Sequence, residues 1–293
     1  MRKINILTKN VYNRIAAGEV IDRPYSAVKE LIENSLDAGA DQIEIYIERG
    51  GKQLIKVVDN GSGIERDDMR AAFLPHATSK IATADDLDTI KTLGFRGEAL
   101  ASISVISKVE LVSVTAGNSA YKVTCEDGKV GEILPSALEK GTEITVRNLF
   151  YNTPVRAKFM KPDKKEESDV TSFVTRYILG NPGVSFKYFV DGKLVLQSYG
   201  GGIDEAMAQV YGAKVLSECY KIKAEKDGLR ISGFIGNQNF FKANKTYQSL
   251  FLNGRYIVNN TVATAISQAY ASYTMKRQYP FYVLFVEVPA DIV

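Results

Sequence analysis

An amphipathic segment that runs directly into an alternating one constrains the fold of this chain more than any other feature. Between Arg23 and Ala38, apolar side chains recur at helical spacing, and Gly39 marks the end of the predicted helix. The positions on its apolar face are Val28, Leu31, Ile32, Ser35 and Leu36. Residues 42–49 then alternate between apolar and polar, a Gly-Gly turn follows, and residues 54–58 return as a second strand. A helix with one apolar face packs against a neighbouring hairpin that also has one apolar face. We therefore expect helices on a sheet in an α+β fold.

The rest of the chain predicts a mixed, mostly antiparallel sheet and a second, smaller α/β domain. Further strands are expected at residues 108–114, 120–126, 130–134, 143–149, 184–190 and 193–198. Further helices are expected near residues 66–73, at 100–106, from the end of a charge cluster at 163–169 to Gly180, and at 203–211. At about 150 residues per domain, 293 residues suggest two domains. Three consecutive glycines at 200–202 suit a hinge, so the sequence predicts domains at residues 1–199 and 200–293.

Composition excludes several classes of protein. With 45% hydrophobic and 24% charged residues, the chain fits neither a disordered nor a collagen-like protein, and 2 cysteines cannot form a disulfide framework. The longest nearly uninterrupted apolar run, Phe281 to Val286, is far shorter than the ~20 residues that span a bilayer. The first eight residues lack the apolar stretch of a secretory signal. We therefore expect a protein of the cytoplasm or the nucleus with no membrane partner.

The sequence offers little support for a metal-binding cysteine motif, a redox-active cysteine pair or a Ser-His or Cys-His catalytic site. Cys125 and Cys219 lie far apart without CxxC partners, so we expect two reduced thiols. His76 is the single histidine, and a Ser-His or Cys-His mechanism would depend on it alone. The phosphate-binding GxxxxGK[ST] loop and the strand-linked GxGxxG fingerprint are both absent. A bound nucleotide would need a different set of residues.

Three polar elements between Glu30 and Glu98 supply such a set. Glu30, Asn34 and Asp37 share one arc of the first predicted helix, opposite its apolar face. Spacing alone favours a merely solvated face there. Two glycine-bearing loops change that balance, because one directly follows the second strand and the other follows a polar segment at 77–92. Their sequences are Asp59-Asn60-Gly61-Ser62-Gly63 and Gly94-Phe95-Arg96-Gly97-Glu98.

The two loops suit the base and the phosphates of ATP. The Asp59 carboxylate can accept a hydrogen bond from the adenine amino group, while Gly61 and Gly63 let the backbone approach the base without a Cβ. Backbone N–H groups at Gly94 and Gly97, ahead of a helix, suit phosphate oxygens. The polar segment before them can fold over the nucleotide as a lid.

The polar arc of the first helix suits the metal and the water. The amide oxygen of Asn34 is a hard, neutral ligand of the kind that Mg²⁺ accepts beside phosphates and waters. One turn earlier, Glu30 can orient and deprotonate a water for attack on the terminal phosphate. The residues thus predict ATP and Mg²⁺ as cofactors.

Five segments carry a resemblance to a known family. They are Arg14-Ile-Ala-Ala-Gly-Glu-Val-Ile-Asp-Arg-Pro24, Glu30-Leu-Ile-Glu-Asn-Ser-Leu-Asp-Ala-Gly39, His76-Ala-Thr-Ser-Lys80, Gly94-Phe-Arg-Gly-Glu-Ala-Leu100 and Phe150-Tyr-Asn-Thr-Pro154. In this order they resemble the hallmark motifs of MutL-type DNA mismatch repair proteins. That family belongs to the GHKL ATPases, with DNA gyrase, the ninety-kilodalton heat-shock chaperone and sensor histidine kinases. The resemblance runs essentially from Met1 to Val293.

The resemblance implies a GHKL, Bergerat-type ATP-binding sandwich followed by a ribosomal-protein-like α/β domain, and an Mg-dependent ATPase. It implies Glu30 as base, Asn34 as magnesium ligand and Asp59 on adenine. The positions that match the family's nucleotide motifs are Asn34, Asp37, Ala38, Asp59, Gly61, Gly63, Thr78, Ser79, Lys80, Gly94, Phe95, Arg96, Gly97, Glu98, Ala99, Leu100 and Thr142. For Thr142 the sequence alone favours a simple turn residue at the start of a strand. The implied partners are DNA, a mismatch-recognition protein of the MutS type, and an identical or related chain that associates when ATP binds.

One departure from the family concerns the end of the sequence. In the family, the strand that ends here as Phe285 to Val293 leads to a lysine that reaches the γ-phosphate from the second domain. This sequence stops before that lysine, and before the carboxy-terminal dimerisation domain, which in some members carries a metal-dependent endonuclease. We therefore expect a fragment that binds ATP but hydrolyses it poorly.

The net charge of +3 allows DNA contact without requiring it. Residues 200–293 hold 10 basic and 7 acidic side chains, so this part carries the whole excess. The DNA-contact candidates are Lys242, Lys245, Arg255, Lys276 and Arg277.

An alternative from another class is a DNA-binding scaffold with ATP as a structural ligand. A histidine kinase needs a phosphoacceptor outside the nucleotide fold, and a topoisomerase subunit should lack the motifs around Gly18 and Phe95.

Overall fold

A computed structural model of the chain describes residues 8–78, 97–275 and 277–289. The chain divides into two compact units, one of residues 1–173 with 186–196 and one of residues 174–185 with 197–293. The division passes within the helix at 163–180, so each unit takes part of that helix. The predicted domain boundary between residues 199 and 200 stays a prediction.

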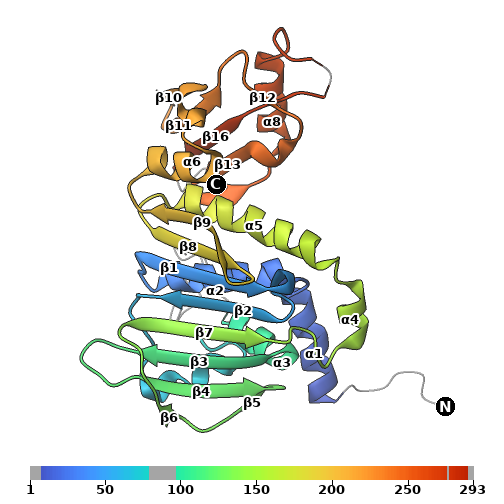
Figure 1. The fold of residues 1–293 in the computed structure, drawn as a ribbon, viewed down its shortest axis with the longest axis vertical. Coiled ribbons are helices and arrows are strands. Elements are labelled where there is room, and N and C mark those ends of the chain that lie inside the picture. The colour runs from blue at the N-terminus through green and yellow to red at the C-terminus, as the bar shows by residue number, and fades with distance from the viewer. Residues whose placement is uncertain (1–7, 79–96, 276, 290–293) are drawn as a thin grey trace, which may run out of the picture. The chain divides into compact units, whose positions relative to one another are not determined.

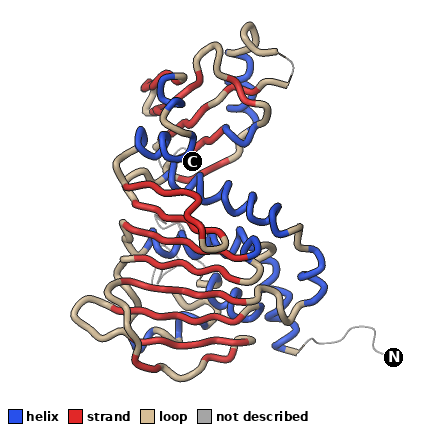
Figure 2. Tube along the Cα trace, in the orientation of Figure 1, coloured by secondary structure: helices blue, strands red, loops and turns tan. Residues whose placement is uncertain are grey.

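A nine-stranded sheet runs through the first unit, with strand order β5-β4-β3-β7-β2-β1-β8-β9 and with β6 paired to β4 (Figures 1 and 2). Its strands are β1 Gln42–Glu48, β2 Leu54–Asp59, β3 Lys108–Val114, β4 Tyr121–Glu126, β5 Lys129–Val130, β6 Leu134–Pro135, β7 Gly141–Arg147, β8 Ser185–Val190 and β9 Lys193–Tyr199. The pairings from β1 through β2, β7 and β3 to β4 are antiparallel, as are those of β5 and β6 with β4. The predicted mostly antiparallel sheet is confirmed.

Helices cover one face of this sheet. The helices of this part of the chain are α1 Lys9–Val20, α2 Pro24–Asp37, α3 Ala99–Ile106, α4 Pro154–Phe159 and the first part of α5 Asp163–Gly180. α2 packs on β2 and α3 on β3, and α3 contacts both α1 and α2 (Figure 1). The sequence-predicted helix at 23–38 is therefore confirmed as α2, within one residue at each end.

The first core forms between the apolar stripe of α2 and the alternating side chains of the hairpin. The fully buried members on the two sides are Val28, Leu31 and Ile32 of α2 and Ile43, Ile45, Ile47, Ile55 and Val57 of the strands. β1 buries every second residue, as a strand with one covered face must. The helix and the hairpin thus fix each other, as their patterns predict.

The second unit holds its own sheet, of order β10-β11-β16-β13-β14, and a two-stranded ribbon of β12 and β15. Its strands are β10 Cys219–Lys226, β11 Leu229–Gly236, β12 Phe241–Lys242, β13 Gln248–Leu252, β14 Arg255–Ile257, β15 Tyr279–Pro280 and β16 Tyr282–Glu287. Its helices are α6 Ile203–Tyr211, α7 Lys214–Ser217, α8 Asn260–Ala269 and the end of α5. β13 and β16 pair in parallel, and the other pairings in this unit are antiparallel.

Three details of the sequence prediction are wrong. The strand expected at 130–134 is two short strands, because Leu134 is 47% exposed and no covered face holds the segment to the sheet. The helical stretch near 66–73 is two 3₁₀ turns, η2 Arg66–Asp68 and η3 Ala71–Phe73. The charge cluster at 163–169 lies within α5 rather than before it. No helix in the described part of the chain is long and apolar enough to cross a membrane.

Replacing Ile45 by alanine should lower the free energy of unfolding by about 2–5 kcal/mol, because this fully buried strand residue leaves a cavity behind. Urea unfolding followed by circular dichroism measures the change. Leu194→Ala on β9, whose side chain is 49% exposed, is the matched control and should change stability by less than about 1 kcal/mol. Equal losses in the two variants would show that β1 is not part of the core.

Candidate functional site

The Asp59 carboxylate is buried at the end of β2, where three segments meet. Asp59 is 8% exposed. Its Oδ2 accepts a hydrogen bond from the hydroxyl of Ser35 on α2 at 2.7 Å, and its Oδ1 accepts one from the backbone N–H of Gly61 at 2.9 Å. Across the sheet, Asp59 stands opposite Thr142 of β7. The carboxylate is thus held in one orientation by helix, loop and sheet.

Two opposing effects act on the protonation of Asp59. Burial raises the pKa of its carboxyl above the usual 3.8, since a charged group is poorly solvated there. Hydrogen bonds from Ser35 and from the backbone N–H groups of Gly61 and Thr142 favour the charged form and oppose this rise in pKa. Burial is the larger effect. The site therefore holds a carboxylate with directed donors and little water, which suits recognition of a further N–H donor.

The loop after Asp59 lies tightly on its neighbours. The backbone N–H of Ser62 donates to the carbonyl of Ala38 at the end of α2, at 2.9 Å. A Cβ on Gly61 would stand 2.8 Å from the Cβ of Ala38, and Gly63 has a φ of 76° with the carbonyl of Val114 at 2.1 Å from the corresponding position. Both glycines are therefore required by packing against α2 and β3. Their predicted approach to a base stays a prediction.

A buried pair of hydroxyls ties the same loop to two strands. Ser113 of β3 and Thr142 of β7 are opposite each other, and their hydroxyl oxygens are 2.9 Å apart. The Ser113 hydroxyl donates to the carbonyl of Gly141 at 3.0 Å and accepts from the backbone N–H of Ile64 at 2.8 Å. Thr142 is 6% exposed. It is therefore part of a hydrogen-bonded network beside Asp59, rather than a plain turn residue.

Along α2, the polar arc stands on the side away from the core. Glu30, Asn34 and Asp37 are partly exposed, while the apolar face is buried. The ammonium of Lys29 lies 3.2 Å from Glu30 and 2.8 Å from Glu33. Burial alone lowers the pKa of Lys29, but hydrogen bonds and charge from the two glutamates outweigh it and hold this pKa above the usual 10.5. Glu30 is thus a carboxylate oriented by a neighbouring cation.

The loop before α3 is described from Gly97 onward. Gly97 has a φ of 59°, and a Cβ there would stand 2.4 Å from the carbonyl of Ala77, which precedes Thr78. Glu98 precedes α3, whose first residues are the predicted Ala99 and Leu100, and its Oε1 lies 3.1 Å from Nδ1 of His76. The sequence-predicted residues that lie outside the described part of the chain are Ser79, Lys80, Gly94, Phe95, Arg96 and Lys276. Most of the predicted lid at 77–92 lies outside it as well.

Sequence reasoning missed several residues of this site. Ser35 was placed on the apolar face of the helix, and a hydroxyl on a buried face was the available signal, because such a group needs a partner. Asn60 accepts from the backbone N–H groups of Asp41 and Gln42, both at 3.0 Å, and so closes the start of β1 onto the loop. The contact of Lys29 with Glu33 follows from i,i+4 spacing, whereas its contact with the adjacent Glu30 does not. For Ser113 no local signal exists, since its partner is 29 residues away.

In the described part of the chain no three His, Cys, Asp or Glu side chains gather as a metal cluster.

The basic residues of the second unit are not equivalent. The Lys242 ammonium lies 4.1 Å from the ring centre of Phe240 and 4.9 Å from that of Tyr247, so it is engaged with aromatic faces. Lys245 lies 5.8 Å from the ring of Tyr279 and is exposed. Arg255, on the edge strand β14, is exposed too, as is Arg277. Lys242 is thus less exposed than Lys245, Arg255 and Arg277.

Comparison with known proteins agrees with this geometry. Residues 23–142 match the family described as histidine kinase-, DNA gyrase B- and HSP90-like ATPase, and residues 207–293 match the carboxy-terminal domain of DNA mismatch repair proteins. The ATPase domain of Aquifex aeolicus MutL, solved with ADP, is 29% identical with a TM-score of 0.71, over 93% of this chain and 95% of that one. The amino-terminal domain of a DNA repair protein is 28% identical with a TM-score of 0.82, over 95% of this chain and 87% of that one. The fold and the family match define a GHKL-type ATPase domain.

Curated relatives show which family of GHKL-type ATPases this chain is similar to. The DNA mismatch repair protein MutL of Clostridium beijerinckii is 43% identical over 100% of this chain, and that of Clostridium botulinum strain Eklund 17B is 41% identical over 98%. The chain belongs to the MutL family of DNA mismatch repair proteins. It spans 43% to 44% of the length of these two relatives.

Replacing Asp59 by asparagine should remove a pH dependence of stability. Because the folded-state pKa of Asp59 is raised above 3.8, the folded wild type binds more protons than the unfolded chain between the two pKa values. Its free energy of unfolding therefore falls, relative to the variant, as pH rises through this window, and the difference is constant above it. Urea unfolding of both proteins at a series of pH values measures the difference. Ser35→Ala should extend the window upward, since it removes a bond to the charged form, whereas a difference independent of pH would contradict the burial effect.

Proposed function

We propose that this chain binds ATP with magnesium at the end of β2 and hydrolyses it. The observation that carries the proposal is the buried Asp59 carboxylate, fixed by Ser35, Gly61 and Thr142 beside the helix that holds Glu30 and Asn34. The ADP-bound structure of the Aquifex aeolicus ATPase domain supports a nucleotide at this fold. The sheet positions Asp59 and Thr142, and α2 positions the other two residues.

Each residue has a distinct role in this proposal. Asp59 accepts a hydrogen bond from the adenine amino group, and Thr142 lies beside it with its hydroxyl bonded to that of Ser113. Asn34 supplies an amide oxygen to Mg²⁺, which when bound neutralises charge on the phosphates. Glu30 accepts the proton of the attacking water, and Lys29 keeps its carboxylate oriented. The Gly94–Leu100 segment donates backbone N–H groups to the phosphates, with Asp37, Ala38 and the 78–80 positions lining the same site.

We infer the wider role of this chain from the names of the proteins it is similar to. Their name, DNA mismatch repair protein MutL, supports a switch that uses its ATP cycle in mismatch repair, with a mismatch-recognition protein and DNA as partners. We propose that ATP promotes association with an identical or related chain, and that this couples recognition to strand excision.

Equilibrium ATP binding with and without Mg²⁺ tests the site directly, by comparing the wild type with Asn34→Ala. Binding that requires magnesium in the wild type and is lost in the variant supports the site. A folded wild type that binds no ATP would sink the proposal.

Replacing Glu30 by alanine should lower the single-turnover rate of ATP hydrolysis by roughly 100-fold or more, because a general base contributes about 10²–10⁴ in rate. ATP affinity should change little, since Glu30 acts on the water rather than on the nucleotide. Glu132→Ala removes an exposed carboxylate in the loop between β5 and β6 and is the control. Undiminished hydrolysis in Glu30→Ala would remove Glu30 from the role of base.

For DNA, Arg255→Glu should weaken binding and lower the slope of log affinity against log salt by about 1, as expected for a phosphate contact. Lys223→Glu is the matched control, since β10 and β14 are the opposite edges of the same sheet and both side chains are exposed. Fluorescence anisotropy with and without ATP measures both. Equal losses would place the contact elsewhere, and binding that ignores nucleotide would favour the scaffold alternative.

A further inference from the structure

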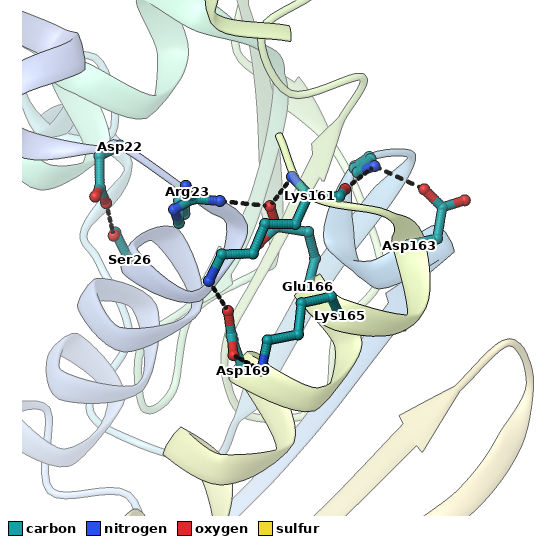
Figure 3. A network of polar contacts seen from close by, with 9 residues as sticks. Asp22, Arg23, Ser26, Lys161, Asp163, Lys165, Glu166 and Asp169 are labelled. Carbon is teal, nitrogen blue, oxygen red and sulfur yellow. Dashed lines mark hydrogen bonds and ion pairs between the residues drawn. The ribbon is translucent and has the colours of Figure 1, made fainter. Parts of the chain in front are cut away.

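A fully buried glutamate connects the start of α5 to the start of α2. Glu166, in the first turn of α5, is 0% exposed. Its Oε1 accepts hydrogen bonds from the guanidinium of Arg23 at 2.9 Å and from the backbone N–H of Lys161 at 2.7 Å (Figure 3). Arg23 is the residue immediately before α2. The contact therefore joins a helix far along the chain to the residue immediately before the helix that carries Glu30 and Asn34.

The turn between β1 and β2 locks the other side of the α5 start. Lys52 donates to the carbonyl of Lys161 at 2.6 Å and lies 2.7 Å from the carboxylate of Asp163, which also binds Arg49 at 3.1 Å. Gly50 has a φ of 68°, and a Cβ there would stand 2.4 Å from the carbonyl of Asp163. The turn and the α5 start are thus in direct contact and cannot shift independently.

The start of α2 has few other restraints of its own. Arg23 is extended, and α2 has neither a side-chain cap nor an acidic residue in its first turn. Pro24 provides no backbone N–H. Beyond the Arg23 contact, Tyr25 stacks on Phe173 of α5 with ring centres 4.6 Å apart, and Ser26 donates to Asp22 at 2.5 Å. α5 therefore supplies two side-chain contacts at this end of α2, beside the close approach of Pro24 to the turn at Gly51.

Stability alone explains the Arg23–Glu166 pair poorly. The Glu166 carboxylate loses its hydration entirely, while the Arg23 side chain stays 27% exposed, so the pair gains little over apolar side chains of similar size. The second oxygen of Glu166, Oε2, is buried and has no hydrogen-bond partner within the described residues. The pair does fix the relative orientation of the Arg23 and Glu166 side chains, since a guanidinium and a carboxylate bind in defined geometry.

We infer that Glu166 is a positioning residue of the ATPase site, which acts through Arg23 to fix the rotation and axial position of α2. Glu30 and Asn34 lie on this rigid helix, so a shift at Arg23 carries over to both. A displacement of about 1 Å at reacting groups is enough to cost roughly 100-fold in rate. The inference rests on the proposed ATPase activity for its consequence, although the contact itself does not.

A double-mutant cycle tests whether Glu166 acts through Arg23. Arg23→Ala, Glu166→Ala and the double variant are compared with the wild type for single-turnover ATP hydrolysis, ATP affinity and thermal unfolding, at a temperature where all four are folded. Asp169→Asn is the matched control, because Asp169 pairs with Lys161 at 2.6 Å and Lys165 at 3.2 Å in the network of Figure 3 and makes no hydrogen bond or ion pair with α2 within the described residues. Hydrogen exchange at the α2 amides is measured on the same proteins.

We expect each single variant to lose roughly 10- to 100-fold in hydrolysis rate and the double variant to lose no more than either. ATP affinity should stay within about threefold, and Asp169→Asn should hydrolyse at the wild-type rate. Losses that multiply in the double variant, or an equal loss in Asp169→Asn, would overturn the inference.

Failure of the proposed function gives a different result. If the wild type hydrolyses no ATP, the ATPase proposal fails and hydrogen exchange decides the inference. Faster exchange at the α2 amides in Arg23→Ala and Glu166→Ala, with wild-type exchange in Asp169→Asn, would uphold the positioning of α2. Unchanged exchange in the two variants would refute it.

Discussion

Burial of one carboxylate against one helix organises the first unit. Asp59 ends β2, and the Ser35 hydroxyl of α2 donates to it, so the helix and the sheet meet at a polar contact inside an otherwise apolar interface. Desolvation works against this arrangement, and the three donors around Asp59 offset it only in part. Such a group persists where it does something besides stabilise the fold. The adjoining loop and the Ser113–Thr142 pair follow from the same need, because each supplies or orients a donor beside it.

Local patterns predict the first unit well where one element determines the next. The apolar stripe of α2 and the alternation of β1 and β2 required each other, and the structure pairs them as expected. The prediction failed where the pattern lacked a buried face, as at residues 130–134, whose Leu134 is exposed. The β-propensity of these residues did not produce a continuous strand there, because such propensity depends on packing against a covering surface. Contacts across long separations, such as Arg23 with Glu166, leave no trace in local periodicity.

The candidate site was visible in the sequence as residue types but not as a geometry. Glu30, Asn34 and Asp37 could be placed on one arc because helical periodicity fixes their directions. The partners that orient them could not, since Ser35 reads as part of an apolar face and Ser113 belongs to a strand far along the chain. Glycines were expected near Asp59 for a ligand, yet the structure requires them for close packing on Ala38 and Val114. Close packing therefore accounts for these glycines with or without a ligand, and their approach to a base stays a prediction.

The aromatic surroundings of Lys242 have a consequence for spectroscopy. Its ammonium stands 4.1 Å from the ring centre of Phe240, 4.9 Å from that of Tyr247 and 6.0 Å from that of Phe281, so the last methylene of the side chain is close to several ring faces. Ring currents shield protons in such positions and move their NMR resonances upfield, away from the crowded lysine region. The chain thus carries a natural probe of whether its second unit is folded, one that needs no label and no nucleotide.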